Sequence, residues 1–212
     1  MPFKRFALFA SLWLIPSFAL WYISYQTVLL PAFQTILKPI IYFGFVTEQA
    51  KLHTKNNGWE VATTILTPDQ PNQKVQRIRV QNIKVEKVVT YTLGFPLLWL
   101  LLLASATHRP RNFFRDFLIG NAVLFGCVAF FLWLKIALLI MNLLSEPNTQ
   151  IYITAGIIKP AIPYPSWLIV GLQFLQTLFA YLCAFIVPIA TWYALLNKED
   201  QQQLLVPTLK HQ

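Results

Sequence analysis

One lysine and two glutamines are the polar side chains whose placement inside apolar segments can serve chemistry. Lys135 is the one charge deep inside an apolar run, and an ionisable residue at membrane depth is a candidate functional residue by default. Gln173 and Gln176 lie near the start of the next apolar run, which should return across the membrane at matching depth. The three side chains can form a polar contact between helices, leave Lys135 to snorkel alone, or bind a substrate or partner.

Catalytic and metal-binding groups do not gather in the sequence. His53, His108 and His211 fall in three separate polar segments, so no trio with metal-ligand spacing forms. Cys127 and Cys183 lie inside apolar runs, where a free thiol behaves as a small apolar residue. We therefore expect no catalytic residues, no metal and no cofactor, and we expect that the protein is not an enzyme.

The composition is that of an integral membrane protein. The chain has 212 residues, of which 56% are hydrophobic and only 12% are charged, whereas about a quarter are charged in soluble domains. The apolar runs extend from end to end, so this is not a soluble domain with one anchor. The net charge of +9 is explained by contacts with anionic lipid headgroups, and nucleic-acid binding is not expected.

A basic loop sets the expected orientation. Arg109, Arg111 and Arg115 lie together in segment 108–116, directly after an uncharged apolar run. Positive charge in a short loop marks the cytoplasmic face, although the cations in 47–87 count against this orientation. These arginines should contact lipid headgroups or, alternatively, dock a cytosolic partner.

The sequence predicts a membrane α-helical fold with four transmembrane helices and a small extracytoplasmic β-hairpin or sheet. Pro31 should end the first helix, and Lys38 and Pro39 favour an interfacial helix after it over a further span. An even number of spans places both termini in the cytoplasm. The expected segments are a first span (1–30), an interfacial helix (31–46), a β-rich insert (47–87), a second span (88–107), the basic loop (108–116), a third span (117–144), an external loop with a short strand at 151–154 (145–166), a fourth span (167–196) and a cytoplasmic tail (197–212).

Two strands are expected in the insert. Residues 59–66 are rich in β-branched side chains, and residues 75–85 alternate in polarity until the phase slips at Gln81 and Asn82, where a bulge or a strand end is expected. A bare hairpin is marginal in water, so its exposed strand edges should engage a membrane or periplasmic protein partner. The candidate partner-contacting residues are Trp59, Val61, Ile65, Ile78 and Val80.

Four apolar motifs carry a family resemblance: 12–22 (LWLIPSFALWY), the stretch from 85 to 105, 117–124 (FLIGNAVL) and the stretch from 172 to 197. Their order and spacing resemble the exosortase-associated membrane proteins of Gram-negative bacteria, of the exosortase H type. The resemblance implies an inner-membrane accessory of a protein-sorting system. It does not imply the sorting enzyme, because Cys127 and Cys183 lie deep in the spans without a matching histidine. No site residue is carried over from the family.

These observations favour a non-enzymatic accessory or scaffold protein that engages a partner through its helices and its β-element. Two alternatives remain open. A small lipid or solute carrier would need a polar cavity around Lys135, and a membrane enzyme would need a reachable cluster around His53 and Glu60.

Overall fold

The computed structural model describes residues 3–44, 51–55, 58–68, 78–85, 88–106, 110–146, 149–153, 157–160 and 163–196. The chain forms two compact units, which we describe separately. Unit 1 comprises Met1–Pro31, Val89–Val128 and Ala180–Gln212, and unit 2 comprises Ala32–Val88 and Ala129–Phe179.

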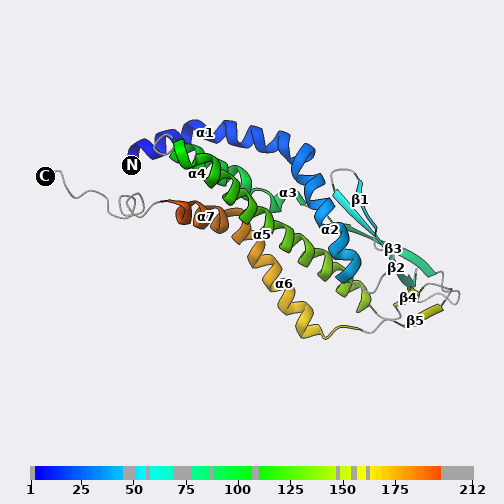
Figure 1. Ribbon diagram of the computed structural model, residues 1–212. Helices are drawn as coiled ribbons and strands as arrows, with labels where there is room; N and C mark the ends of the chain where they lie inside the picture. The colour runs from blue at the N-terminus through cyan, green and yellow to red at the C-terminus, as the bar shows by residue number, and fades with distance from the viewer. Residues whose placement is uncertain are drawn as a thin grey trace. The chain divides into compact units, whose positions relative to one another are not determined.

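Helices dominate the structure (Figure 1). Four of the helical stretches are long and apolar enough to cross a membrane, which confirms the membrane α-helical fold. The candidate spans are Phe6–Pro39, Val88–Ala106, Asn112–Leu144 and Ser166–Leu195. The helical elements are α1 (Phe3–Ser24), η1 (Tyr25–Leu29), α2 (Leu30–Gly44), α3 (Val88–Tyr91), α4 (Gly94–Ala106), α5 (Pro110–Leu144), α6 (Ser166–Tyr181), η2 (Leu182–Ile186) and α7 (Val187–Leu195).

The first helix does not end at Pro31, contrary to the sequence-based prediction. The five-residue π-helical turn η1 joins α1 to α2 without a break, and the backbone N–H of Leu30 donates to the carbonyl of Tyr25. This wider turn lets the chain pass a proline, which has no N–H and would clash with an ordinary α-helical turn. The candidate span has 34 residues. At the rise per residue of an α-helix this length is greater than the ~30 Å thickness of the hydrocarbon core, so part of the helix must extend beyond the core. An interfacial position for 31–46 stays a prediction.

The last span uses the same device. The π-helical turn η2 precedes Pro188, and the N–H of Val187 donates to the carbonyl of Leu182. In both helices the proline follows the π-helical turn after one intervening residue. A π-turn before a proline is therefore a repeated local solution in this chain.

The basic loop is shorter than predicted. Helix α5 begins at Pro110, so residues 110–116 form its first turns and do not belong to a loop. Proline is favoured at a helix start because its missing N–H would have no partner there. Arg111 and Arg115 are consequently helical residues.

Unit 2 contains a five-stranded antiparallel sheet, which agrees with the predicted hairpin or small sheet and has three strands more than the two expected in the insert. Strand β2 lies in its interior: β3 pairs along one edge of β2, while β1 and then β4 pair along the other edge, and β5 pairs with β4. The segment 145–166, which the sequence predicts to be an external loop, thus contributes two strands to the sheet. The strands are β1 (Lys51–Lys55), β2 (Gly58–Pro68), β3 (Ile78–Val85), β4 (Gln150–Ile153) and β5 (Ile157–Pro160).

The predicted phase slip is confirmed. Asn82 pairs with Ala62, but Val80 pairs with Leu66, so the register shifts between these two pairs. The additional residues lie on β2, opposite Gln81. A bulge of this kind bends the strand locally and increases its twist.

The core of unit 2 combines its helices and its sheet. Side chains that are fully buried come from α2, from β2 and from the second half of α5. They are Phe33, Leu37, Val61, Ile65, Leu132 and Ile136. The buried core of unit 2 thus includes residues of both its helices and its sheet.

Candidate functional site

Helix α4 is the central element of unit 1. Helices α1 and α7 and the turn η2 all pack against it, and the arrangement is visible in Figure 1. Nine of the thirteen residues of α4 are buried. We therefore expect buried polar contacts of this unit around α4.

One tryptophan connects α1 to the turn before α4. The indole N–H of Trp21 donates to Thr92 Oγ over 3.2 Å, and the Thr92 hydroxyl donates onward to the carbonyl of Val89 at 2.8 Å. Thr92 is fully buried, so a single hydroxyl satisfies both the indole and a carbonyl in an apolar environment.

A second tryptophan connects α4 to α5. The indole N–H of Trp99 donates to Asn121 Oδ1 over 2.7 Å, and Asn121 Nδ2 donates to the carbonyl of Phe117 over 2.7 Å. The Trp99 ring also lies 6.2 Å from the rings of Phe95 and Phe117. The amide is thus held in one orientation by its own helix and presents its oxygen to α4.

A third tryptophan connects α7 to the end of α4. Trp192 Nε1 lies 3.4 Å from Ser105 Oγ, at the long limit of a hydrogen bond. The Ser105 hydroxyl also bonds the carbonyls of Leu101 and Leu102, and Phe6 of α1 stacks on Trp192 with a centroid distance of 5.3 Å. The three tryptophans therefore mark the start, the middle and the end of α4.

A glycine allows α4 and η2 to approach closely. A Cβ atom at Gly94 would collide with the backbone carbonyl oxygen of Cys183. The N–H of Val187, which an α-helix would direct to this carbonyl, donates to Leu182 instead, and Pro188 has no N–H to offer. The Cys183 carbonyl is thus released from the helix ladder by the π-turn, and it packs on the Gly94 backbone, where a Cα–H can approach it.

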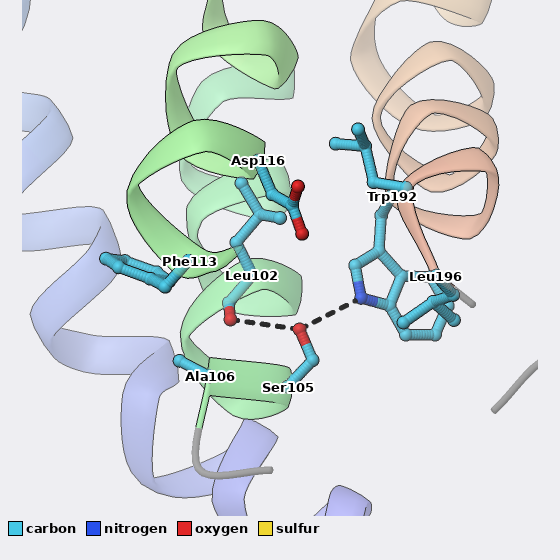
Figure 2. Close-up of a pocket in the computed structure, with 8 residues that line it drawn as sticks. Leu102, Ser105, Ala106, Phe113, Asp116, Trp192 and Leu196 are labelled. Carbon is cyan, nitrogen blue, oxygen red and sulfur yellow. Dashed lines mark hydrogen bonds between the residues drawn. The ribbon is translucent and has the colours of Figure 1, made fainter. Parts of the chain in front are cut away.

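A small pocket lies beside Trp192 at the end of α4 (Figure 2). Its free space measures about 280 Å³, including the part open to solvent. The carboxylate of Asp116 lies on the side of its helix that faces Trp192, and the Ser105 hydroxyl lies close by. The lining residues are Leu102, Ser105, Ala106, Phe113, Asp116, Trp192, Leu195 and Leu196.

Asp116 is the charged group of this pocket. Its side chain is 10% exposed, whereas that of Arg115 is 61% exposed. Arg115 donates to Asp116 Oδ1 twice, at 2.9 Å from Nη2 and at 3.1 Å from Nε. The positive charge of Arg115 is therefore balanced by its neighbour, a feature that counting arginines in the sequence did not reveal.

The other predicted arginines are only partly described. Arg109 lies outside the described residues, and for Arg111 only the helical backbone is described. Contacts of Arg109, Arg111 and Arg115 with lipid headgroups stay a prediction.

The predicted polar cluster lies within unit 2. Lys135 and Gln176 are half-buried, whereas Gln173 is exposed on α6. Phe131 of α5 stacks on Phe179 of α6 with a centroid distance of 4.6 Å. Lys135 lies one turn beyond Phe131, and Gln176 lies about one turn before Phe179. A site formed by these side chains stays a prediction.

The predicted partner strands need a correction. Trp59, Val61 and Ile65 are buried, and their strand β2 has neighbours along both edges. Strand β2 therefore offers no edge to a partner, because β1 and β4 pair along one edge and β3 pairs along the other. Ile78 and Val80 belong to β3, and their side chains lie outside the described part of the structure.

Within the described residues, no group of three His, Cys, Asp or Glu side chains could hold a metal ion. Cys127 and Cys183 are free thiols.

Sequence reasoning missed most of the groups around α4. The partners Thr92, Ser105 and Asn121 are short polar residues in apolar runs, and this is the signal that could have drawn attention to them. Nothing in the sequence indicates which tryptophan each residue meets, because that depends on how the helices pack.

The fold and its internal contacts define an α-helical membrane protein with four candidate spans and a small antiparallel sheet. The family model described as exosortase H-associated membrane protein matches residues 1–199. The chain belongs to this family, which confirms the resemblance seen in its sequence. No curated protein and no solved structure matches the chain.

Proposed function

We propose that the protein is a non-enzymatic accessory of an exosortase system in the bacterial inner membrane, where it binds the exosortase as a scaffold. In this proposal the sheet lies in the periplasm and both termini lie in the cytoplasm. The observation that carries the proposal is the family match over residues 1–199, whose description names an association with exosortase H.

The outer face of α6 supports a helix-mediated contact. Large apolar side chains recur at helical spacing along it and remain exposed, with Trp167 at 73%. Within a membrane such a face meets lipid or another protein helix, and tryptophan and tyrosine are enriched among residues that dominate binding energies. The residues of this face are Trp167, Val170, Phe174, Leu178 and Tyr181.

The free edge of β3 supports a second contact. Among the described strands, β3 pairs with β2 alone, and it has eight residues, compared with five in β1 and four in β5. Lysines at both ends of β1 and Pro160 at the end of β5 protect those edges against strand addition. An extended segment of the partner can therefore add to the sheet at β3.

Two neighbouring prolines test this edge. Successive N–H groups of a strand point to opposite edges, so Ile83→Pro and Lys84→Pro remove one N–H that faces β2 and one that faces the open edge. Both positions lie in regular pairs with β2, at Val61 and Glu60. The variants are co-expressed with exosortase H, and both co-purification and melting temperature are measured.

The proline that removes an N–H facing β2 should lower the melting temperature. The proline that removes an N–H facing the open edge should abolish co-purification, while the melting temperature stays near that of the unsubstituted chain. Phe174→Ala provides the matching test of the α6 face. If the exosortase co-purifies equally with all three variants, the proposed contacts are wrong. If it does not bind the unsubstituted chain either, the scaffold function is wrong.

A further inference from the structure

The pocket beside Trp192 lies where spans end. Ala106 and Leu195 are the last residues of two candidate spans, and both line the pocket. The C-terminal ends of helices carry partial negative charge, so α4 and α7 both favour a cation here. This end of unit 1 is at the level where hydrocarbon gives way to lipid headgroups.

Neighbouring residues present opposite charges at this level. The largely buried carboxylate of Asp116 faces into the pocket, and the exposed guanidinium of Arg115 lies outside it. Both hydrogen bonds from Arg115 to Asp116 reach the same carboxylate oxygen, Oδ1. Oδ2 receives no hydrogen bond from Arg115, so within the described residues it can accept one from a cationic donor.

We propose that this pocket binds the headgroup of a phosphatidylethanolamine lipid. The primary ammonium donates to Asp116 Oδ2 and lies near the indole ring of Trp192, which favours a cation. The phosphate, two carbons away in the headgroup, pairs with Arg115. The ammonium of the lipid thus lies beside Asp116 and the phosphate lies beside Arg115, so each charge of the lipid is next to a residue of opposite charge.

Other ligands fit less well. Phosphatidylglycerol brings no cation, so Asp116 gains no charged donor besides Arg115, and the carboxylate repels the net negative charge of this lipid. The quaternary ammonium of phosphatidylcholine has no N–H to donate. A lysine side chain from a protein partner carries the ammonium but no adjoining phosphate for Arg115. The pocket encloses about 10 Å³, room for one group of roughly the size of a water molecule, so only the ammonium enters it and the rest of the headgroup lies outside.

The test uses the full chain in nanodiscs with equal amounts of the three lipids, followed by native mass spectrometry of the lipids that remain bound. The unsubstituted chain should retain phosphatidylethanolamine preferentially. Asp116→Asn should reduce this preference by about tenfold, because a hydrogen bond to a charged group is lost, and Arg115→Gln should reduce it less. Glu146→Gln removes the same charge from an exposed residue beyond α5 and should change nothing.

The melting temperature of each variant shows whether it folds. If Asp116→Asn does not fold, the lipid preference of the unsubstituted chain and of Arg115→Gln still decides the matter. Equal retention of the three lipids by the unsubstituted chain overturns the proposal, as does an undiminished preference in a folded Asp116→Asn variant. Binding of a lysine-containing peptide without any lipid preference also overturns it and assigns the pocket to a protein partner.

Discussion

The indole N–H of Trp99 donates to the side-chain oxygen of Asn121 over 2.7 Å and thereby joins α4 to α5 inside an apolar part of the molecule. Apolar packing between membrane helices gains little from the hydrophobic effect, because lipid chains are as apolar as the protein interior. Directed contacts such as this one therefore select which faces of the helices meet.

Trp99→Phe keeps an aromatic ring and removes the donor. We expect a loss of about 0.6 to 1.7 kcal/mol in the free energy of unfolding, the range measured for polar contacts between membrane helices. Unfolding in mixed micelles checks this value. Trp167→Phe, on the exposed face of α6, should change the free energy by much less, and an equal loss in both variants would contradict the assigned role of Trp99.

Gly94→Ala tests the close approach of α4 and η2. The added methyl group would meet the Cys183 carbonyl, so the helices must separate, at a cost of about 1–3 kcal/mol as in other overpacked cores. A thermal unfolding series measures the cost. At Gly126 a Cβ would meet no atom within 4 Å, so Gly126→Ala is the control and should be neutral or slightly stabilising.

Tyr25→Phe should be neutral or stabilising, although Tyr25 is buried. Its hydroxyl has no hydrogen-bond partner among the described residues, and a buried unsatisfied polar atom costs about 1–3 kcal/mol. Trp21→Phe, one turn earlier on α1, should instead destabilise the protein, because Trp21 donates to Thr92. A lower melting temperature for Tyr25→Phe than for Trp21→Phe would contradict this assignment.

Phe131→Ala tests the stacking of α5 on α6 within unit 2. Phe131 is buried and stacks on Phe179, so the substitution should cost about 3–5 kcal/mol. The neighbouring Phe130 is exposed, and Phe130→Ala should cost less. Chemical denaturation of the two variants gives the comparison, and similar losses would argue against a specific α5–α6 contact.

The proposed orientation predicts opposite labelling of two single cysteine substitutions. Asn57→Cys should react with a membrane-impermeant maleimide in intact cells, whereas Asn112→Cys should react only after the inner membrane is opened. The unsubstituted chain is the control, since Cys127 and Cys183 lie within candidate spans. Labelling of both substitutions from one side would contradict the orientation.

The sequence by itself determined the number of candidate spans, the position of the β-rich insert and its register slip at Gln81 and Asn82. These features are recorded locally: about 20 apolar residues suffice to cross a membrane, and a two-residue alternation assigns side chains to the faces of a strand. The family resemblance also rests on local motifs, and the match over residues 1–199 confirmed it.

Only the tertiary structure decided how these elements are used. Pro31 is a helix breaker by type, yet the π-turn before it carries the helix onward. Strand β2 was expected to present an exposed edge, yet β1 and β4, the latter about 85 residues away, pair along one edge and β3 pairs along the other. In a span that is apolar on every side, the sequence pattern does not distinguish a face that meets lipid from a face that meets protein, because both environments are equally apolar. The pairing of Trp99 with Asn121, and the place of Asp116 in a pocket, therefore had to come from the packing itself.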